Sequence, residues 1–304
     1  IDAGNGRFIL QRVNTSVFND PGRMMENISI VLRKIPRLFL VPALDGRPYY
    51  EDGSGFYRVY NFIEDSITYG KVESDDMAWK MGRALMEFHS ALSSMDGSAL
   101  YETIPHFHDM SFRLEQFERA VSEDRAGRAA TVGREIGFIR ENGKRASRIS
   151  SMYNEGLLPC RVTHNDAKLQ NMLFSRTTGD FLTFIDLDTV MPGTILFDTG
   201  DMMRTGCSLA EEDEEDLEKV RFSVPFFQAM KDGYFSLSDG MPADMEASLF
   251  NESGLAITFI MALRFLTDYI NGDTYFRVDR PDHNLVRARN QMRLIEEMEK
   301  HQII

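Results

Sequence analysis

Two short segments carry the side chains that could do chemistry together. The first, HNDAKLQN, spans residues 164–171 and places Asp166 five positions before Asn171; the second, FIDLD, spans residues 184–188 and closes an apolar run with Asp186. Phosphoryl transfer needs a carboxylate beside the acceptor hydroxyl and divalent cations held across the nucleotide phosphates. The spacing predicts Asp166 as the catalytic carboxylate, and Asn171 and Asp186 as metal ligands.

The residues between these segments predict how they meet. MLF at 172–174 is apolar, SRTTGD favours a turn, and FLTFI is apolar again, which is the pattern of a β-hairpin. Because paired hairpin strands run antiparallel, Asn171 and Asp186 would lie at the same end. We therefore expect the two side chains to share a magnesium ion, with Asp188 as a further candidate ligand.

Two neighbours of Asp166 have candidate roles. The Lys168 ammonium could stabilise the negative charge of the transferring phosphoryl group, and we expect it to be catalytic. His164 is expected to hold the loop by hydrogen bonds to backbone carbonyls, with direct chemistry as the alternative. A His-x-Asp triplet often arises by chance, and a single Asp after an apolar strand usually caps a turn or helix. The combination of order, spacing and hairpin is what favours a kinase.

Hydrophobic periodicity predicts an α+β chain with two lobes. The first lobe contains a helix over 21–35 and strands at 7–13, near 37–41, at 48–51 and at 56–63. Beyond residue 74, apart from the hairpin, the pattern predicts helices over 75–95, 111–123, 131–154, 212–232, 243–271 and 282–301. The boundary near residue 64 gives an N-terminal nucleotide-binding lobe, residues 1–64, and a helical C-terminal lobe, residues 65–304, with the catalytic loop and the substrate site.

An acidic run, EEDEEDLE at residues 211–218, leads into the amphipathic stretch that ends near Met230. Acidic side chains are favourable at the N-terminus of a helix, so the run predicts the solvated start of the helix at 212–232. Cation binding by this run is the alternative.

The two lobes would enclose a cleft, which is where a nucleotide would bind. The segment that crosses between them would offer its backbone to the adenine edge, through Tyr60, Asn61, Phe62 and Ile63. The simpler interpretation, that Tyr60 and Phe62 pack on the buried face of a strand, is compatible with this role because the bonds come from the backbone.

These segments resemble the aminoglycoside phosphotransferase and choline kinase-like family, relatives of protein kinases that phosphorylate small molecules, and are most similar to its N-acetylhexosamine 1-kinases. The resemblance covers nearly the whole chain and is carried by THNDAKLQNMLF, FIDLDTVMPG, FDTGDMMR, YRVYNFIEDS at 57–66, LRFLTDYINGDTYF at 263–276 and HNLVRARNQ at 283–291. It implies a protein kinase-like fold, ATP and Mg²⁺ as cofactors, and a sugar phosphorylated on its anomeric hydroxyl. It also implies that Asp201 braces the catalytic loop.

The first strand departs from the family pattern. The lysine that kinases place there is absent, the strand offers Gln11 and Arg12, and alternation lets only one of them face the phosphates. We favour Arg12 for this role, with transfer of the role to another residue as the alternative; Glu26 is a candidate partner, and a solvent-facing position of Glu26 is equally compatible with the sequence. Because the family has a nucleotide-covering loop upstream of Ile1, we also expect that the first strands of the lobe are missing.

The acceptor site is expected near Asp166 in the large lobe. Arg264 and Asp268 are four positions apart on the apolar stretch ITFIMALRFLTDYI, so they share a helix face. A structural ion pair and a contact with substrate are equally compatible with that spacing. The resemblance places Arg264 and Tyr275 in the sugar site, and we assign Asp268 to it as well. Tyr275 could stack on a sugar face, with burial in the core as the alternative.

Composition excludes several classes of partner. The formal net charge is -13, and nucleic acid or an anionic membrane would require a basic face, so we expect neither as a partner. Two cysteines argue against a disulfide framework. The chain shows no basic-then-apolar leader, and its strongest apolar segment is interrupted by Arg264, so a monomeric cytoplasmic protein is expected.

Two other functions remain open. A kinase for an aminoglycoside, choline or another sugar would keep the same catalytic loop, although a cationic acceptor would need a cage of carboxylates or aromatic rings. A non-catalytic nucleotide-binding pseudokinase is the second alternative. The presence of Asp166, Asn171 and Asp186 weighs against it, and the unusual Gln11 and Arg12 weigh slightly for it.

Overall fold

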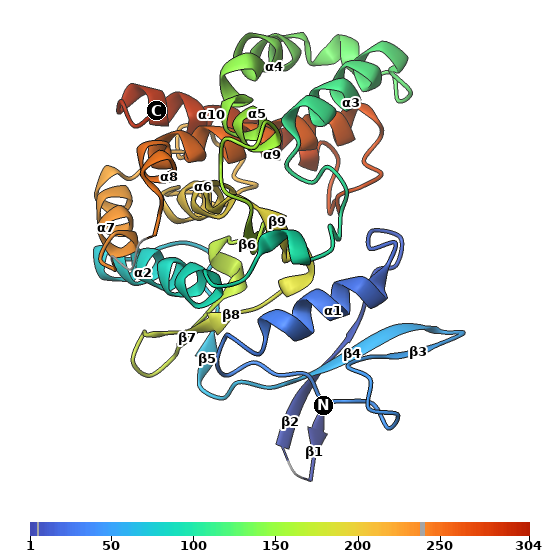
Figure 1. Ribbon diagram of the computed structural model, residues 1–304. Coiled ribbons are helices and arrows are strands. Elements are labelled where there is room, and N and C mark those ends of the chain that lie inside the picture. Colours follow the sequence, from blue (N-terminus) through green and yellow to red (C-terminus); the bar gives the residue numbers. More distant parts are fainter. Residues whose placement is uncertain (5, 238–240) are drawn as a thin grey trace.

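The computed structural model describes residues 1–4, 6–237 and 241–304. A sheet and one helix form the lower part of the molecule in Figure 1, a helical bundle forms the upper part, and a small hairpin lies between them. This arrangement confirms the predicted α+β fold with a small antiparallel sheet and a larger helical part.

The small sheet is antiparallel, with strand order β1-β2-β4-β3: β1 (Asp2–Ala3), β2 (Gly6–Arg12), β3 (Tyr50–Asp52) and β4 (Gly55–Asn61). Alternation along β4 buries every second side chain, namely Phe56, Arg58 and Tyr60, against the single helix of this part, α1 (Pro21–Val31). That helix begins where the Asp20 carboxylate accepts a hydrogen bond from the Arg23 amide at 3.0 Å, with Pro21 in its first turn.

The strand predicted near 37–41 is reduced to one bridge between Leu40 and Tyr60. Pro36 and Pro42 bracket this segment and cannot donate to a ladder, and Arg37 has a positive φ of 76°. The chain therefore crosses the edge of β4 without extending the sheet.

Strand pairing and buried hydrogen bonds join the two parts. After β4 the chain forms β5 (Ser66–Ile67), which pairs with β7 (Met172–Ser175) of the hairpin, and β7 pairs with β8 (Phe181–Phe184). The buried Asn27 of α1 donates hydrogen bonds to the carbonyl oxygens of Val190, at 2.9 Å, and Tyr101, at 2.7 Å. Helix α1 is thus attached to the helical part as well as to the sheet.

The helical part surrounds one long helix, α9 (Phe250–Ile270). Its other elements are α2 (Asp75–Leu92), α3 (Met110–Glu123), α4 (Gly133–Ala146), α5 (Arg148–Asn154), the strand pair β6 (Arg161–Thr163) and β9 (Met191–Gly193), α6 (Ile195–Gly206), α7 (Val224–Tyr234), α8 (Asp244–Ser248) and α10 (His283–Lys300). By length and composition α9 could span a membrane, but 83% of its most apolar window is buried by the surrounding helices, as in a core helix. The helix predicted over 131–154 is divided into α4 and α5.

Two glycines let α2 and α7 cross in contact. A Cβ on Gly82 would lie 1.9 Å from the Met230 carbonyl oxygen, and one on Gly233 would lie 2.0 Å from that of Trp79. Neither position could hold a larger residue without separating the helices.

The prediction of a helix over 212–232 is wrong for the first half of that range. Residues 211–218 form turns, and α7 begins at Val224, where the Ser223 side chain caps its first turn. The acidic side chains contact cations of other elements instead: Glu212 pairs with Arg204 of α6, and Asp213 lies 3.3 Å from Arg280. These ion pairs between elements outweigh the local helical preference of the run.

Candidate active site

The catalytic loop follows β6 and turns sharply at Asn165. This residue has a left-handed φ of 62°, and its side-chain amide donates to the carbonyl oxygen of Thr189 at 3.1 Å and, more weakly, to those of Thr163 and Met191 at 3.3 Å. Left-handed backbone at a non-glycine residue persists only where its surroundings fix it. The turn places the next residue, Asp166, in the cavity below.

A buried carboxylate braces this loop, and it belongs to Asp198 rather than to Asp201. Asp198 accepts hydrogen bonds from the backbone amides of His164 at 2.9 Å and Asn165 at 2.6 Å. Its third contact is with His89 Nε2 at 2.9 Å, and Nδ1 of His89 lies 2.9 Å from the Tyr234 hydroxyl. The expectation for Asp201 is therefore corrected.

Asp166 lies between two side chains of its own loop. Its Oδ2 accepts hydrogen bonds from Lys168 Nζ and from Asn171 Nδ2, each at 2.8 Å. Burial opposes ionisation, but the charge and hydrogen bond of Lys168, with smaller contributions from His164 and Asn171, hold the pKa of Asp166 below its ordinary value. Among the described residues nothing donates to Oδ1, so this atom can accept a proton from an acceptor hydroxyl.

The hairpin brings Asp186 to the same place as Asn171. The Ile185 amide donates to the Asn171 carbonyl oxygen at 2.9 Å, and the Ile185 carbonyl accepts from His164 Nε2 at 3.0 Å, which is the loop-holding contact expected of His164. Asp186 itself has a left-handed φ of 58°. Burial, and then the negative charges of the Asp188 and Asp166 carboxylates, raise the pKa of Asp186. The negative charge around Asp186 is therefore not fully balanced.

The donors around Asp186 fit a magnesium ion. The side-chain nitrogen of Asn171 already donates to two atoms of Asp166, Oδ2 and the backbone carbonyl oxygen. The side-chain oxygen of Asn171 is therefore the atom that could bind a metal ion. A cation would relieve the repulsion that raises the pKa of Asp186. In the described ranges no three His, Cys, Asp or Glu side chains are grouped so that they could hold a metal alone.

The cation that reaches this cluster from the small sheet is Arg58. Its buried guanidinium pairs with Asp188, and its Nε donates to the side chain of Gln11, directly opposite on β2, at 2.9 Å. Arg12 lies elsewhere: it is exposed and donates to the Ser54 carbonyl oxygen at 2.9 Å. Asp188 is thus an ion-pair partner of Arg58 as well as a candidate ligand.

The segment after β4 follows the edge of the sheet. The Asn61 amide donates to the Phe39 carbonyl oxygen at 3.2 Å, and the Phe62 amide donates to that of Arg7 at 3.0 Å. The Ile63 amide has no hydrogen-bond partner within the described ranges. Of the predicted adenine contacts, Ile63 N–H is therefore the donor that remains available, while Tyr60 is buried on the inner face of β4.

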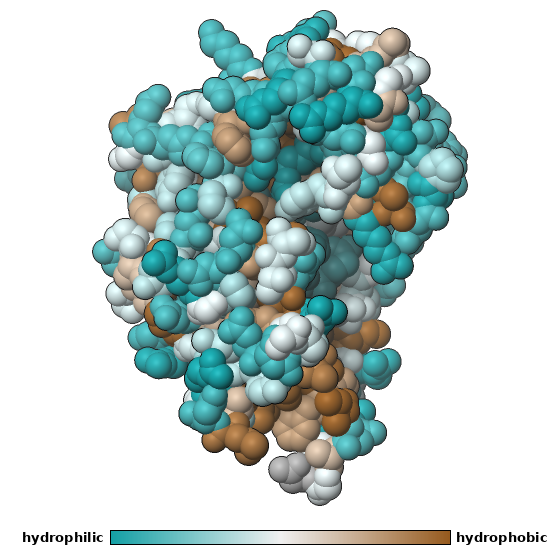
Figure 2. Space-filling view, turned by 90° about the vertical axis from the view of Figure 1, so that its right-hand side faces the viewer, coloured by the Kyte–Doolittle hydropathy of each residue, from teal (hydrophilic) through white to brown (hydrophobic). Residues whose placement is uncertain are grey.

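A cavity of about 600 Å³ opens from the catalytic loop, and Asp166, Lys168, Asp186 and Asp188 line it. Figure 2 shows the molecule hollowed at mid-height, with mostly hydrophilic residues around the hollow. Asp201 also faces this cavity, where it contacts Arg204 at 2.8 Å; burial dominates and raises the pKa of its carboxyl group.

Opposite the catalytic loop the cavity is lined by Arg264 and Tyr275, whose hydroxyl lies 3.3 Å from the guanidinium. The arginine stacks against aromatic rings, with its guanidinium carbon 4.8 Å from the centre of Phe107 and 5.3 Å from that of Phe276. Arg264 and Tyr275 line the same cavity as Asp166, and their contact with an acceptor stays a prediction. Arg264 and Asp268, which are both described, form no ion pair with each other.

Asp268 organises the loop that carries Tyr275. Its Oδ1 accepts from the backbone amides of Thr274 at 2.9 Å and Tyr275 at 2.8 Å, and its Oδ2 accepts from the Phe276 amide and the Asn284 side chain, each at 2.9 Å. Both oxygens are engaged, so the prediction that Asp268 contacts substrate is corrected to a positioning role.

Three residues of the site were missed or left unassigned by the sequence interpretation. Alternation in GFYRVY puts Arg58 on the same face as Phe56 and Tyr60, a signal that was present but unused. Asp198 and Glu212 carried no local signal, because their partners lie on distant segments.

The chain is similar to known phosphotransferases and kinases. A model described as the phosphotransferase enzyme family matches residues 1–224. An aminoglycoside phosphotransferase from Alicyclobacillus acidocaldarius is similar at 13% identity, with a TM-score of 0.61, covering 99% of this chain and 88% of its own. A spectinomycin phosphotransferase in complex with ADP and spectinomycin has 12% identity and a TM-score of 0.60, covering 100% and 88%. A choline kinase from Streptococcus pneumoniae has 15% identity and a TM-score of 0.55, covering 98% and 88%. These likenesses show the protein kinase-like fold.

Proposed function

This chain belongs to the phosphotransferase enzyme family, whose members transfer phosphate to an alcohol, and we propose that it uses ATP to phosphorylate the anomeric hydroxyl of an N-acetylhexosamine. The observation that carries the proposal is the arrangement around Asp166. Its carboxylate is fixed by Lys168 and Asn171 in a cavity that also contains Asp186. That is the set of groups required to orient a hydroxyl and to hold a metal-bound triphosphate.

In the proposed reaction the acceptor hydroxyl donates a hydrogen bond to Asp166 Oδ1. The hydroxyl oxygen attacks the γ-phosphorus of ATP, the bond between that phosphorus and the β–γ bridging oxygen breaks, and its electron pair leaves on ADP. The proton passes from the acceptor to Asp166. Lys168, 2.8 Å from Oδ2, keeps this carboxylate ionised and presents positive charge to the transferring group.

The nucleotide would bind between the small sheet and the catalytic loop. The unpartnered Ile63 amide is the proposed donor to the adenine edge. Asn171 and Asp186 would hold Mg²⁺, which neutralises phosphate charge when bound. Arg58 is the cation of the small sheet nearest to this metal segment, and we assign to it the role expected of Arg12.

The acceptor side of the cavity favours a neutral polyol over a cationic amine. Arg264 and Tyr275 offer a guanidinium, a hydroxyl and an aromatic face, which suit sugar hydroxyls and an acetamido carbonyl. The nearby carboxylates of Asp201 and Glu212 are both paired with Arg204. On this side of the cavity a choline or an aminoglycoside would meet Arg264, whose positive charge would oppose its own.

The test is an ATP-consumption screen with GlcNAc, GalNAc, glucose, galactose, choline and kanamycin, followed by NMR of the product. We expect turnover with an N-acetylhexosamine and phosphate on the anomeric oxygen. Asp166→Asn should lower kcat by about a thousandfold or more and leave the Kd for an ATP analogue within about threefold, because the base does not contact the nucleotide in the ground state.

Other outcomes would change the assignment. Preference for choline or kanamycin would refute the sugar and retain the kinase. Nucleotide binding without turnover of any acceptor would support the pseudokinase alternative. Unchanged sugar phosphorylation by the Asp166→Asn variant would remove Asp166 from the mechanism.

A further inference from the structure

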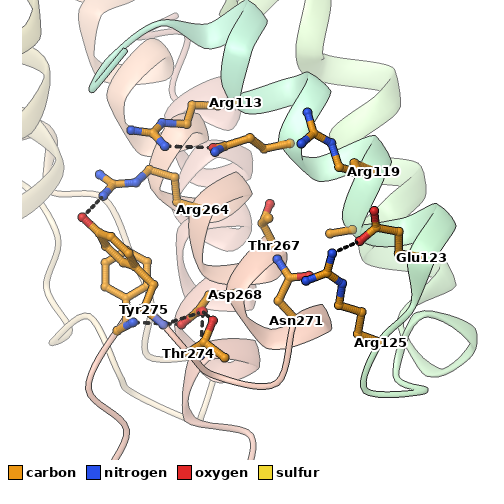
Figure 3. Close-up of a pocket in the computed structure, with 13 residues that line it drawn as sticks. Arg113, Arg119, Glu123, Arg125, Arg264, Thr267, Asp268, Asn271, Thr274 and Tyr275 are labelled. Carbon is orange, nitrogen blue, oxygen red and sulfur yellow. Dashed lines mark hydrogen bonds and ion pairs between the residues drawn. The ribbon is translucent and has the colours of Figure 1, made fainter. Parts of the chain in front are cut away.

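A second pocket lies beside the catalytic cavity, between α3 and α9 (Figure 3). Its volume is about 420 Å³, and it shares Arg264, Tyr275 and Phe276 with the catalytic cavity, so the two spaces adjoin. In Figure 3 the guanidinium groups of Arg113, from α3, and Arg264, from α9, lie next to each other at one end of this pocket. No step of the proposed reaction uses Arg113.

The pocket is positively charged, although the chain as a whole carries a net charge of -13. Four arginines line it, against two carboxylates: Arg113, Arg119, Arg125 and Arg264, against Glu123 and Asp268. Both carboxylates are already engaged. Glu123 lies 2.7 Å from Arg125, and Asp268 accepts hydrogen bonds from the loop that it caps.

Arg113 is held only by uncharged acceptors. Its guanidinium donates to the Phe107 carbonyl oxygen at 3.3 Å and to the Gln116 side chain at 2.8 Å, and no carboxylate of the described ranges lies within ion-pair distance. Burial, and then the charge of Arg264, lower the pKa of Arg113 to about 10. The folded protein therefore holds an inadequately compensated cation here.

Arg264 is likewise held by uncharged partners. Its hydrogen-bond partners are the Tyr275 hydroxyl at 3.3 Å and the Met261 sulfur at 3.9 Å, and it lacks a carboxylate partner among the described residues. Burial is the main cause that lowers its pKa. Elsewhere in the structure, the buried Arg58 and Arg204 each contact a carboxylate.

Two adjacent, desolvated guanidinium groups with neutral partners are costly unless an anion joins them. Their donors suit a planar carboxylate or a phosphate, which guanidinium groups bind through paired hydrogen bonds. We propose that the pocket between α3 and α9 binds an oxyanion, a carboxylate or a phosphate ester, between Arg113 and Arg264. Because the pocket adjoins the acceptor cavity, this anion is either a substituent of the acceptor or a separate ligand beside it, and the first case rests on the proposed function.

Binding is tested with inorganic phosphate as the probe, by following the thermal unfolding midpoint at constant ionic strength. We expect phosphate to raise the midpoint of the unmodified protein, and the Kd from the concentration dependence to be about tenfold higher in Arg113→Gln, the loss of one charge-assisted hydrogen bond. Arg140→Gln is the matched control, since Arg140 is exposed, pairs with Glu118 outside the pocket, and its loss changes the net charge equally. It should keep the Kd of the unmodified protein.

No rise with phosphate, or the same Kd in Arg113→Gln and in Arg140→Gln, would overturn the proposal. If Arg113→Gln does not fold, Arg113→Lys replaces it, because it keeps the charge but cannot form paired hydrogen bonds. The Kd of this variant should lie between those of the unmodified protein and a neutral pocket, and a Kd equal to that of the unmodified protein would count against the site.

Steady-state kinetics identify the source of the anion. Two acceptors are compared, an N-acetylhexosamine and the same sugar with a phosphate ester on carbon 6. If the anion belongs to the acceptor, Arg113→Gln should raise KM for the charged sugar about tenfold and leave KM for the neutral sugar within about twofold. If it is separate, inorganic phosphate should change KM for the neutral sugar in the unmodified protein but not in Arg113→Gln.

The two proposals fail separately. If no sugar is phosphorylated, the proposed acceptor is wrong, but a phosphate Kd that depends on Arg113 still supports the pocket. If sugar is phosphorylated and Arg113→Gln alters neither binding nor kinetics, the pocket proposal is wrong and the proposed function stands.

Discussion

Replacing Asp198 with Asn should loosen the catalytic loop from within the core. The carboxylate is fully buried and accepts from the His164 amide, the Asn165 amide and His89 Nε2 at 2.6–2.9 Å. An asparagine oxygen in the place of Oδ2 could keep the contacts with the His164 amide and His89, but the contact of Oδ1 with the Asn165 amide would be lost. Its NH₂ group would then face a backbone N–H, so a donor would meet a donor.

The expected loss follows from these contacts. A hydrogen bond to a charged group contributes about 1.5–3 kcal/mol, and a buried donor left without an acceptor adds a desolvation cost. Losing the contact with the Asn165 amide, and bringing two donors face to face in its place, should lower the free energy of unfolding by about 3 kcal/mol. That is a large fraction of the roughly 5–15 kcal/mol that stabilises a typical domain. The folded enzyme should survive with a less ordered loop.

The measurement is amide hydrogen exchange by mass spectrometry on a peptide that covers residues 161–168, together with urea unfolding. Protection of this peptide should fall by about a hundredfold or more in Asp198→Asn. Asp180→Asn is the control, because it removes the same charge from an exposed carboxylate that contacts Lys80 at 3.2 Å. Its effect on unfolding should be within about 0.5 kcal/mol.

A second comparison separates Asp198 from Asp201. Asp201→Asn should perturb Arg204 and leave protection of the 161–168 peptide nearly unchanged. Should Asp198→Asn keep protection within threefold of the original protein, or should Asp201→Asn reduce it more, the bracing role assigned to Asp198 would be incorrect.

Three further outcomes are expected. The pKa of Asp186 is raised above its ordinary value of 3.8 in the folded protein, so ionisation of Asp186 destabilises the metal-free fold as the pH rises from 3.8 through the folded-state pKa. Asp186→Asn should therefore raise the urea midpoint at neutral pH, give no such gain in stability in acid, and abolish Mg²⁺-dependent turnover. Arg58→Met should cost about 3 kcal/mol by leaving Asp188 without its partner, and adding Asp188→Asn should restore part of that loss, whereas additive costs would contradict the ion pair. Gly82→Ala should lower the free energy of unfolding by at least about 2 kcal/mol, since its methyl group would lie 1.9 Å from a carbonyl oxygen of α7. The control, Gly137→Ala on α4, meets open space and should be neutral or stabilising by up to about 1 kcal/mol, and equal effects of the two changes would refute the packing argument.

Local patterns were sufficient for the parts of the structure that depend on local interactions. The spacing from Asp166 to Asn171, and the apolar strands around a turn, placed Asp186 beside them, because a hairpin pairs residues close in sequence. Helix α1 was predicted from its periodicity and from Pro21, although the structure ends it at Val31.

The other features of the site could not be predicted from local patterns, because they depend on contacts between segments that are separated in the sequence. Asp198 and Asp201 are three residues apart on one helix, and nothing local shows which of them reaches the loop preceding Asp166. The sequence interpretation weighed Gln11 and Arg12 and did not consider Arg58, because only the folded sheet shows which side faces Asp188. The acidic run was mistaken for a helix start because one of its partners, Arg280, lies 67 residues away and left no local signal.

The two-residue strand β5 determines where this molecule can swivel. Just before it, Asp65 accepts hydrogen bonds from Ser175 at 2.6 Å and Thr177 at 2.8 Å, so the chain is anchored to the hairpin from Asp65 onward. Asn27 anchors α1 to the same body. The buried side chains of β4 hold the sheet on α1, and Arg58 of the same strand pairs with Asp188, so widening of the cleft would work against both contacts as the chain bends within residues 62–64.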